Sequence, residues 1–564
     1  MLRYPVYLIR LVLRLLGNLR RLTGRPPEYI HLTLEGDYPQ FRTPPTGWLQ
    51  RLLTADETSL QDLQHRFEMV AADPRVKGII LNLRQLTMPL TRLQALRSYM
   101  KTLRSAGKQV VIWSSGYDTA AYYLAAAGDQ ILLQPGGSIA PLGIERSFVY
   151  LADTLAWAGL EADFLQSTPY KSAPEMLMQS EMSDEVREMA NWLLDAQYED
   201  LLAAVAAGRF VTRQAAAAFI DDSPYTDLEA RERGFVDALV SQEELAGHLG
   251  GAGRPVRLAG WDQGRRRLLL PPVTPPGKYV ALIRIEGDIV DGRSRRGPGK
   301  PRIPLLLSNR AGDVTVVQAA RRALADRRAA AVVLYIESGG GSATASEVMT
   351  AALEQLATRK PLVAVMGPVA GSGGYYVATP AKKIFAQPGT LTGSIGVVMG
   401  KIVSAGLMDR LRFHRHHISR GDNARLYDTA RKFTDQERQR LGRHLDRFYR
   451  LFVDRVAAAR HMTFASVDAV GGGRVWTGRQ AVEHGLIDGL GGVNEALAEA
   501  RKLAGLPAAA RLREVVSGKQ ELAPLSLRQP SEWVDYPLSG VRALMSGRPL
   551  YLCPVVWYDP AGPL

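Results

Sequence analysis

The chain has 564 residues, of which 46% are apolar and 22% charged, and its formal net charge is +14. This length predicts about two to four domains, and the composition excludes an intrinsically disordered protein. A single cysteine, Cys553, excludes an intramolecular disulfide framework and a cysteine-based metal site. The positive charge is accompanied by no nucleic-acid-binding motif and no aromatic platform, so it does not predict a nucleic-acid partner.

The first 25 residues are mostly apolar but carry four arginines at helical spacing, namely Arg3, Arg10, Arg14 and Arg21. At 100° per residue, these arginines lie within about 40° of one another around a helix. A membrane-spanning helix needs about 20 apolar residues and tolerates central arginines poorly. We therefore expect residues 1–25 to form an amphipathic membrane anchor, which lies in the headgroup region or inserts with its arginines reaching back to the surface. The alternative is a soluble helix docked on the protein.

Two halves of the chain resemble each other, which indicates a tandem duplication. Asp73–Arg84 matches Asp326–Glu337 and Ala121–Ile144 matches Gly374–Val397, both at an offset of 253 residues. We expect an anchor, a first repeat, a linker rich in Gly, Pro and Arg, a second repeat and a tail. They cover residues 1–25, 28–245, 246–278, 279–505 and 506–564. The tail contains a strand-like segment at 551–558, and its sequence indicates no role.

Each repeat alternates short apolar runs with helical patterns, which is typical of buried parallel strands in an α/β fold. The predicted strands are 30–34, 78–83, 110–115 and 131–134 in the first repeat, and 280–285, 331–336, 362–367 and 384–387 in the second. A long amphipathic helix follows in each repeat, beginning at Ser183 and at Thr434. Both of these residues precede acidic side chains, the usual signature of a helix N-terminus. The fold class is therefore α/β, present twice.

Three glycine-rich segments of the second repeat have no counterpart in the first. They cover residues 336–347, 367–376 and 390–396. The first two leave predicted strands and enter helices, so their backbone N–H groups are candidates for binding an oxyanion. Ser372 lies between Gly371 and Gly373 in such a turn, where nucleophilic serines are commonly presented.

A nucleophilic serine needs a base, and no histidine of the chain lies in a recognisable triad context. A lysine serves instead where burial lowers its pKa. Lys171 lies in a polar loop of the first repeat. At the offset of 253, Lys171 aligns with Ala424, and Ser372 aligns with Thr119. A lysine and a serine that each lack a partner in their own repeat suggest one site shared by the two repeats.

Four motifs together resemble the S49 serine peptidases, in the form of the long, two-repeat bacterial signal peptide peptidases. They are YKSAPE, SGGGSATASE, GSGGYYVATPAKKIFAQPGTLTGSIGV and RVWTGRQAVEHGLIDGLGG. The resemblance covers about residues 28–505. It implies two ClpP/crotonase-like α/β domains in a membrane-bound endopeptidase that degrades signal peptides left after secretion. It also implies a homotetramer, peptide substrates, and no metal or organic cofactor.

Carried onto this sequence, the resemblance makes Ser372 the nucleophile and Lys171 the general base and later general acid. Ser394 would hydrogen-bond to Lys171 and orient it.

The resemblance also places the oxyanion hole in the glycine-rich turns, with donors from Gly373 and from either Gly340 or Gly341. Gly339 stands where the family usually has proline, and the choice between Gly340 and Gly341 stays open.

Two other classes of protein remain as alternatives. A crotonase-like acyl-CoA enzyme shares the fold but does not need a serine–lysine pair, and a non-catalytic membrane scaffold does not need Ser372, Lys171 and Ser394. The side of the membrane is open as well. The resemblance implies a catalytic body outside the cytoplasm, whereas Arg20, Arg21 and Arg25 favour the cytoplasmic side for the residues after the anchor.

Overall fold

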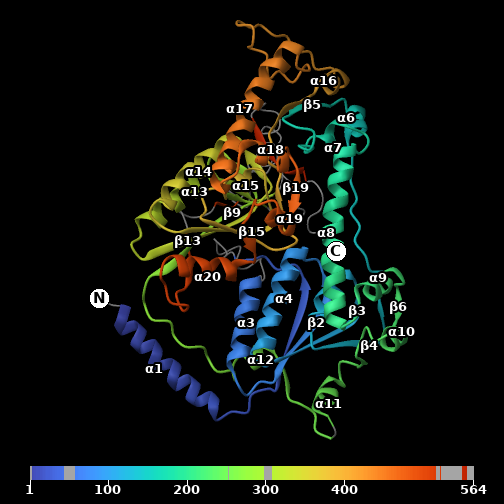
Figure 1. Cartoon of the computed structure of the whole chain (residues 1–564), viewed down its shortest axis with the longest axis vertical. Coiled ribbons are helices and arrows are strands. Elements are labelled where there is room, and N and C mark those ends of the chain that lie inside the picture. Colours follow the sequence, from blue (N-terminus) through green and yellow to red (C-terminus); the bar gives the residue numbers. More distant parts are fainter. Residues whose placement is uncertain are drawn as a thin grey trace. The chain divides into compact units, whose positions relative to one another are not determined.

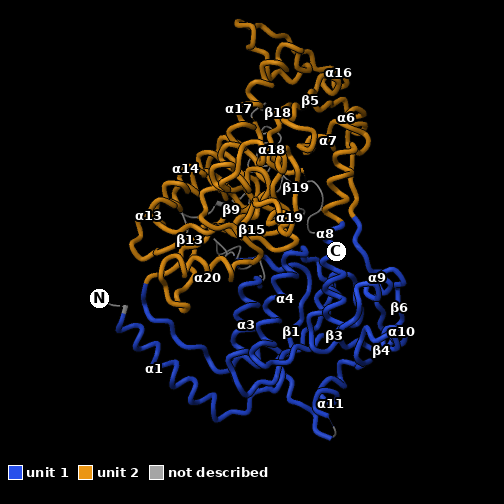
Figure 2. The backbone as a smooth tube through the Cα atoms, in the orientation of Figure 1, with its two compact units in different colours: residues 1–145, 195–277, 561–564 blue, residues 146–194, 278–560 orange. Residues whose placement is uncertain are grey.

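The computed structural model describes residues 3–42, 58–251, 253–297, 308–515, 521–522 and 549–554. The chain forms two compact units (Figure 2). Unit 1 comprises residues 1–145, 195–277 and 561–564, and unit 2 comprises residues 146–194 and 278–560. Helix α8 (Asp184–Arg209) contains one of the boundaries between them. Residues 146–194, which lie within the first sequence repeat, are therefore part of unit 2.

Unit 1 is built on a mainly parallel sheet in the order β6-β4-β3-β2-β1-β8, with β7 beside β4. Its strands are β1 (Tyr29–Gly36), β2 (Gly78–Leu86), β3 (Gln109–Tyr117), β4 (Gln130–Ile139), β6 (Tyr225–Thr226), β7 (Ala238–Leu239) and β8 (Leu258–Gly260). Its helices include α1 (Arg3–Leu22), α3 (Leu60–Ala72), α4 (Leu90–Ser105), α5 (Thr119–Ala125), α9 (Arg213–Asp221), α10 (Asp227–Glu232), α11 (Leu245–Gly250) and α12 (Trp261–Gly264). Helices α3 and α4 lie side by side in Figure 1.

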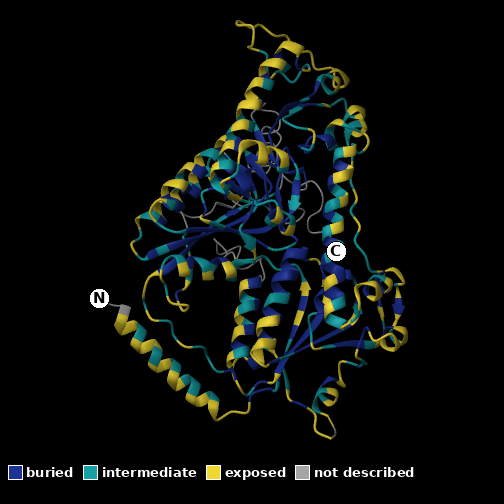
Figure 3. Cartoon of the chain, viewed as in Figure 1, coloured by how far each residue is buried: buried dark blue, intermediate teal, exposed yellow. Residues whose placement is uncertain are grey.

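The main sheet of unit 2 has the order β19-β17-β15-β13-β9-β21, and β16 pairs with β15 and β20. Its strands are β9 (Tyr279–Glu286), β13 (Ala329–Ser338), β15 (Leu362–Gly371), β16 (Lys383–Ala386), β17 (Leu391–Gly393), β19 (Val475–Thr477), β20 (Gly489–Leu490) and β21 (Leu512–Glu514). Every residue of β15 is buried, as expected for a strand covered on both faces. Figure 3 shows these buried strands in dark blue.

The helices of unit 2 include α13 (Asp313–Ala325), α14 (Ala343–Ala357), α15 (Gly373–Tyr376), α17 (Asp435–Arg460), α18 (Phe464–Val470), α19 (Gly478–Glu483) and α20 (Val493–Leu503). The shorter helices α6 (Ala152–Trp157), α7 (Glu175–Met178) and α16 (Ala405–Arg410) belong to it too. The N-terminus of α17 is a capping box, in which Thr434 and Glu437 each accept the other's backbone N–H. Ser183 Oγ accepts the N–H of Val186 in the first turn of α8. Both predicted helix starts are confirmed.

The two units repeat one topology. Strands β1, β2, β3 and β4 of unit 1 pair in parallel in the same order as β9, β13, β15 and β16 of unit 2. The first strand of each set has one further parallel neighbour, β8 or β21. The eight predicted strands correspond to these elements, and only the prediction 384–387 extends one residue beyond its strand, β16. The duplicated α/β architecture predicted from the sequence is therefore present.

Unit 2 also holds a second sheet, in the order β22-β11-β12-β10-β14-β23-β18-β5. Its strands are β22 (Glu521–Leu522), β11 (Arg295–Arg296), β12 (Arg310–Gly312), β10 (Asp288–Val290), β14 (Gly340–Ser342), β23 (Leu550–Leu552), β18 (Val398–Val403) and β5 (Glu161–Gln166). The tail strand expected at 551–558 corresponds in part to β23, and residues 555–558 lie outside the described residues. Strand β5, from the first sequence repeat, is antiparallel to β18.

Helix α1 (Arg3–Leu22) is an amphipathic helix, as predicted. Many of its apolar side chains are exposed, among them Leu8, Ile9 and Leu13 (Figure 3). The side chain of Asn18 is bonded to the backbone of Leu270 in both directions, at 3.1 and 2.8 Å. Within the described ranges, no helix combines the length and the apolar character needed to cross a membrane.

Candidate active site

Ser372 occupies a strained turn between β15 and α15. Its φ is 54° and its ψ is −116°, a conformation that is uncommon for a residue other than glycine. The Ser372 N–H donates to the Gly393 carbonyl at 2.8 Å. Close packing also requires glycine at position 374, where a Cβ would lie 2.3 Å from the Ser338 carbonyl oxygen. A sharp strand-to-helix turn of this kind presents a nucleophilic side chain at the end of a sheet.

The Lys171 ammonium nitrogen meets three oxygens of two serines. Nζ lies 2.6 Å from Ser372 Oγ, 2.7 Å from the Ser394 carbonyl oxygen and 2.8 Å from Ser394 Oγ. A neutral lysine has two N–H groups and one lone pair. It can donate to both Ser394 oxygens and accept the hydroxyl proton of Ser372, which is the arrangement that a general base requires.

Burial changes the pKa of Lys171. Lys171 is 0% exposed, and this burial lowers its pKa to about 7, while the nearby Cys553 thiol acts in the opposite direction. Removal from water disfavours the charged ammonium relative to the neutral amine. A large fraction of Lys171 is therefore neutral near pH 7 and able to take a proton.

The two glycine-rich turns meet beside Ser372. Gly340 has a φ of 102° and Gly341 a φ of 147°, so both favour glycine. A Cβ on Gly340 would lie 2.8 Å from the Gly373 nitrogen. The Gly340 N–H donates to Ser338 Oγ at 3.1 Å. The candidate oxyanion donors Gly340, Gly341 and Gly373 therefore lie close together, and none of them has a side chain.

Comparison with known proteins identifies the family. The model of peptidase family S49 matches residues 102–250 and 354–507, one segment in each sequence repeat. The chain belongs to peptidase family S49. Protease 4 of Salmonella typhi is 30% identical over 468 residues, which cover 80% of this chain and 73% of that protein. The chloroplast serine protease SPPA of Arabidopsis thaliana is 29% identical over 498 residues, covering 87% of this chain and 71% of that protein.

The chain is therefore a serine endopeptidase, and peptides are its substrates. A shorter relative, from Synechocystis sp., is 30% identical over 300 residues, which cover 50% of this chain and 99% of the relative. Almost all of this relative thus aligns with about half of the chain, in agreement with a duplication.

In this S49 peptidase, the pairing of β5 with β18 holds the Lys171 loop. The Ser167 N–H donates to the Val397 carbonyl at 3.0 Å, and Ser167 Oγ accepts the Val397 N–H at the same distance. Thr168 Oγ1 donates to the Gly472 carbonyl at 2.7 Å. The loop is therefore bonded to the chain three residues after Ser394 and to the glycine run that precedes Arg474.

Two glycines for which the sequence indicated no role, Gly396 and Gly473, make room for the lysine. A Cβ on Gly473 would lie 2.3 Å from the Lys171 nitrogen, and one on Gly396 would lie 2.9 Å from Lys171 Cδ. The run of three glycines that ends at Gly473 is a signal from which this close approach could have been predicted. Ser394 is fixed nearby, with a φ of 52° and its N–H donating to the Arg474 carbonyl at 2.6 Å.

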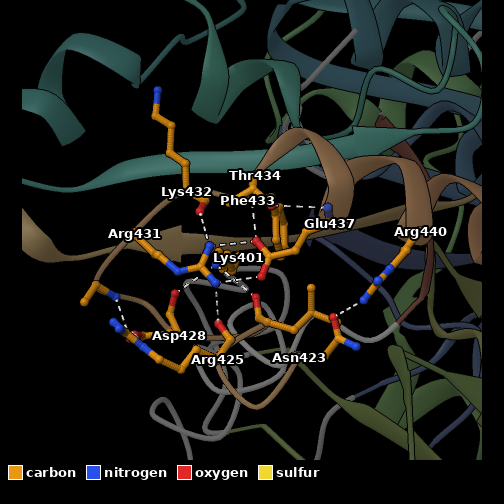
Figure 4. Close-up of polar contacts among 12 residues, drawn as sticks. Lys401, Asn423, Arg425, Asp428, Arg431, Lys432, Phe433, Thr434, Glu437 and Arg440 are labelled. Carbon is orange, nitrogen blue, oxygen red and sulfur yellow. Dashed lines mark hydrogen bonds and ion pairs between the residues drawn. The ribbon is translucent and has the colours of Figure 1, made fainter. Parts of the chain in front are cut away.

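A second buried lysine, Lys401, lies in β18 and bonds this strand to the chain that precedes α17 (Figure 4). Lys401 Nζ donates to two backbone carbonyls at 2.8 and 3.1 Å and lies 4.1 Å from the centre of the Phe433 ring. Arg431 pairs with Glu437 at 2.6 Å, and Asp163 of β5 accepts the Phe433 N–H at 2.7 Å. This cluster ties β5 and β18 to the start of α17. Lys401 therefore supports the fold, whereas Lys171 faces a serine hydroxyl.

Proposed function

We propose that Ser372 and Lys171 form the catalytic dyad of this S49 peptidase and that Ser394 positions the lysine. The contact of 2.6 Å between Lys171 Nζ and Ser372 Oγ carries the proposal. Neutral Lys171 accepts the hydroxyl proton as Ser372 Oγ attacks the carbonyl carbon of a peptide bond. Ser394 holds the lysine in line through its two acceptors, so that the lone pair faces the hydroxyl.

The developing oxyanion is proposed to be bound by the N–H of Gly373 and that of Gly340 or Gly341. Lys171 then donates its proton to the departing amine as the carbon–nitrogen bond breaks and leaves an acyl ester on Ser372. A water molecule, deprotonated by Lys171, attacks this ester. The bond from the carbonyl carbon to Ser372 Oγ breaks, the peptide carboxylic acid leaves, and Oγ takes the proton back from Lys171. One oxyanion donor typically contributes about 10²–10³ to the rate.

The proposed substrates are extended, apolar peptides such as signal peptide remnants. The support is the S49 resemblance and an apolar cluster, with Met189, Val369 and Leu391, that packs with Cys553 beside Gly371. Each repeat, over residues 28–245 and 279–505, is proposed to have a ClpP/crotonase-like fold. The first repeat supplies Lys171 through a segment that packs within unit 2.

Membrane association through residues 1–25 and a homotetramer complete the proposal, with the catalytic body outside the cytoplasm of a bacterium. The exposed apolar side chains of α1 support a position in the headgroup region. Flotation with anionic liposomes tests this position, and a chain lacking residues 1–25 is the control. Light scattering of the detergent-solubilised protein tests the assembly.

Trapping the acyl ester tests the dyad. The purified protein is mixed with an apolar peptide ester, quenched in acid and digested, and the acylated serine is located by mass spectrometry. We expect an ester on Ser372 in the wild type and none in Lys171→Ala. An ester on another residue, or turnover of an acyl-CoA thioester in place of peptides, would refute the proposal.

A further inference from the structure

The C-terminal strand β23 lies inside the second sheet of unit 2, between β14 and β18. It is antiparallel to both neighbours. Gly340, Gly341 and Ser342 of β14 pair with Leu552, Tyr551 and Leu550, and Val398 of β18 pairs with Leu550. The Cys553 N–H extends this pairing by donating to the Gly339 carbonyl at 2.8 Å. The last described strand of the chain is thus paired along its length with β14 and at one residue, Leu550, with β18.

Both neighbours of β23 belong to the active site. Strand β14 starts at Gly340, one of the candidate oxyanion donors, and β18 starts four residues after Ser394. If β23 withdrew, the two strands would border a gap one strand wide, with backbone donors and acceptors facing it. An extended peptide binds to such edges by strand addition. A peptide substrate that reaches Ser372 would therefore take the place that β23 occupies.

The side chains of this segment are those of an apolar peptide. Leu550 and Leu552 pack with Ala173 and Val398. Cys553 packs against an apolar cluster of Met189, Leu193, Val369, Leu391 and Val475. Its sulfur reaches the nucleophile turn, since a Cβ on Gly371 would lie 2.8 Å from Cys553 Sγ.

The site is closed while β23 is docked. Ser372, Lys171 and Cys553 are all 0% exposed. A peptidase has to admit a chain to its nucleophile, so a closed site has to open before each reaction. The segment that occupies the groove is the one whose departure would open it.

We propose that residues 550–553 are an intramolecular inhibitor, which occupies the peptide groove until it withdraws and lets a substrate strand take its place. The proposal rests on the function proposed above. Apparent substrate affinity is reduced by the fraction of molecules in which the groove is open. Because the inhibitor is part of the same chain, this fraction is independent of protein concentration.

The first experiment removes the segment. A chain that ends at residue 548 is compared with a matched control that ends at residue 554 and keeps β23, using a fluorogenic Ala/Leu-rich peptide. If β23 is docked in about 90–99% of molecules, its removal raises kcat/KM about 10- to 100-fold. The control remains close to the full chain. A folded 548-residue chain with unchanged kcat/KM would overturn the proposal.

Removal of β23 also removes Tyr551, which stacks on Tyr376 in the core, so the shorter chain can lose stability. A second variant avoids this loss. Leu552→Asp places a charge in the apolar contact with Ala173 and Val398 and keeps Tyr551, and Leu552→Met is its matched control. The aspartate variant is expected to raise kcat/KM, and the methionine variant to leave it near the wild-type value.

A second readout needs no turnover. Cys553 is the single cysteine of the chain, so its alkylation by iodoacetamide reports how often the segment withdraws. In Ser372→Ala, a saturating concentration of the same peptide is expected to accelerate alkylation at least tenfold. An alkylation rate that does not respond to the peptide would overturn the proposal.

The two readouts separate the possible failures. Peptide-accelerated alkylation in a protein that cleaves nothing would refute the proposed function and leave the competition for the groove intact. If the protein cleaves peptides but the peptide does not change the alkylation rate of Cys553, only the inhibitor proposal is refuted. The same holds if Leu552→Asp leaves kcat/KM unchanged. Protection of Cys553 that falls on dilution would show that the segment comes from a second copy, which would also overturn the proposal.

Discussion

The third strands of the two sheets, β3 and β15, end in chemically different turns. After β15, Ser372 stands between two glycines with a φ of 54° and contacts Lys171. After β3, the aligned Thr119 is the first residue of α5, which Asp118 caps by accepting the Ala121 N–H at 2.8 Å. One topology thus carries an ordinary helix cap in unit 1 and a strained, glycine-flanked serine in unit 2. The two units therefore share the sheet and differ in the chemistry of this turn.

The hydroxyl of Thr119 also has a structural use. Thr119 Oγ1 is bonded to the backbone of Gly143 in both directions, at 3.0 and 3.2 Å. At the other turn, Thr87 and Met88 of unit 1 align with Gly340 and Gly341, and Met88 is buried in the core. Side chains therefore fill in unit 1 the space that bare backbone leaves in unit 2.

The largest expected effect tests which of these turns is catalytic. Ser372→Ala removes the proposed nucleophile, and peptide turnover is expected to fall about 10⁴- to 10⁶-fold. Thr119→Ala is the matched control at the equivalent turn, and its kcat is expected to stay within about twofold of wild type while its Tm falls slightly. Equal losses in the two variants would contradict the assignment of the site to unit 2.

Two buried lysines offer the next comparison. Lys171→Met removes the proposed base and is expected to lower kcat about 10²- to 10⁴-fold with little change in KM. Lys108 of unit 1 is also buried, but its Nζ donates to the backbone carbonyls of Asp73 and Val76 at 2.7 and 2.6 Å. Lys108→Met is therefore expected to lower Tm and leave kcat close to wild type. A reversal of the two patterns would show that Lys171 is structural.

The pH dependence of kcat/KM also tests whether Lys171 is the catalytic base. The pKa of Lys171 is about 7, below its ordinary value of 10.5, and the neutral form is the base. Activity is therefore present above pH 7 and is lost as the pH falls, about tenfold per unit below pH 7. We would measure kcat/KM from pH 5 to pH 9, with folding followed by circular dichroism. A profile that is flat through pH 7 would exclude this lysine as the titrating base.

The smallest effect is expected for the residue that positions the lysine. Ser394→Ala removes one acceptor of Lys171 and keeps the Ser394 backbone carbonyl, so kcat is expected to fall about 5- to 10-fold. The pH midpoint should shift as well, which a purely structural role would not produce. Pro141 aligns with Ser394 in unit 1. Pro141→Ala, as the control, is expected to change neither quantity.

Most of the fold could be predicted from the sequence, because its signals are local. Apolar runs such as 362–367 predicted the buried strands, and Thr434 with Glu437 predicted the start of α17. The extent of unit 2 could not be predicted in this way. Residues 146–194 join it through the pairing of β5 with β18, and such pairing depends on partners more than 200 residues away.

The same distinction applies to the site. Ser372 and the glycines could be found from one local pattern, and Lys171 only through the family resemblance, since a lysine in a polar loop is common. The contact of Cys553 with the nucleophile turn could not be predicted. Nothing local to the tail indicates that residues 550–553 would pair with β14, and the pairing arises only in the assembled sheet.

Lys171 and Ser372 are separated by 201 positions, and this separation matters during synthesis of the enzyme. A ribosome releases the lysine long before the serine and its glycine-rich turns, so a half-made chain carries no dyad and cannot hydrolyse its surroundings. The segment that fills the groove is translated later still. A protease made in this order has no dyad until Ser372 has been synthesised, and residues 550–553 follow the serine by fewer than 200 positions.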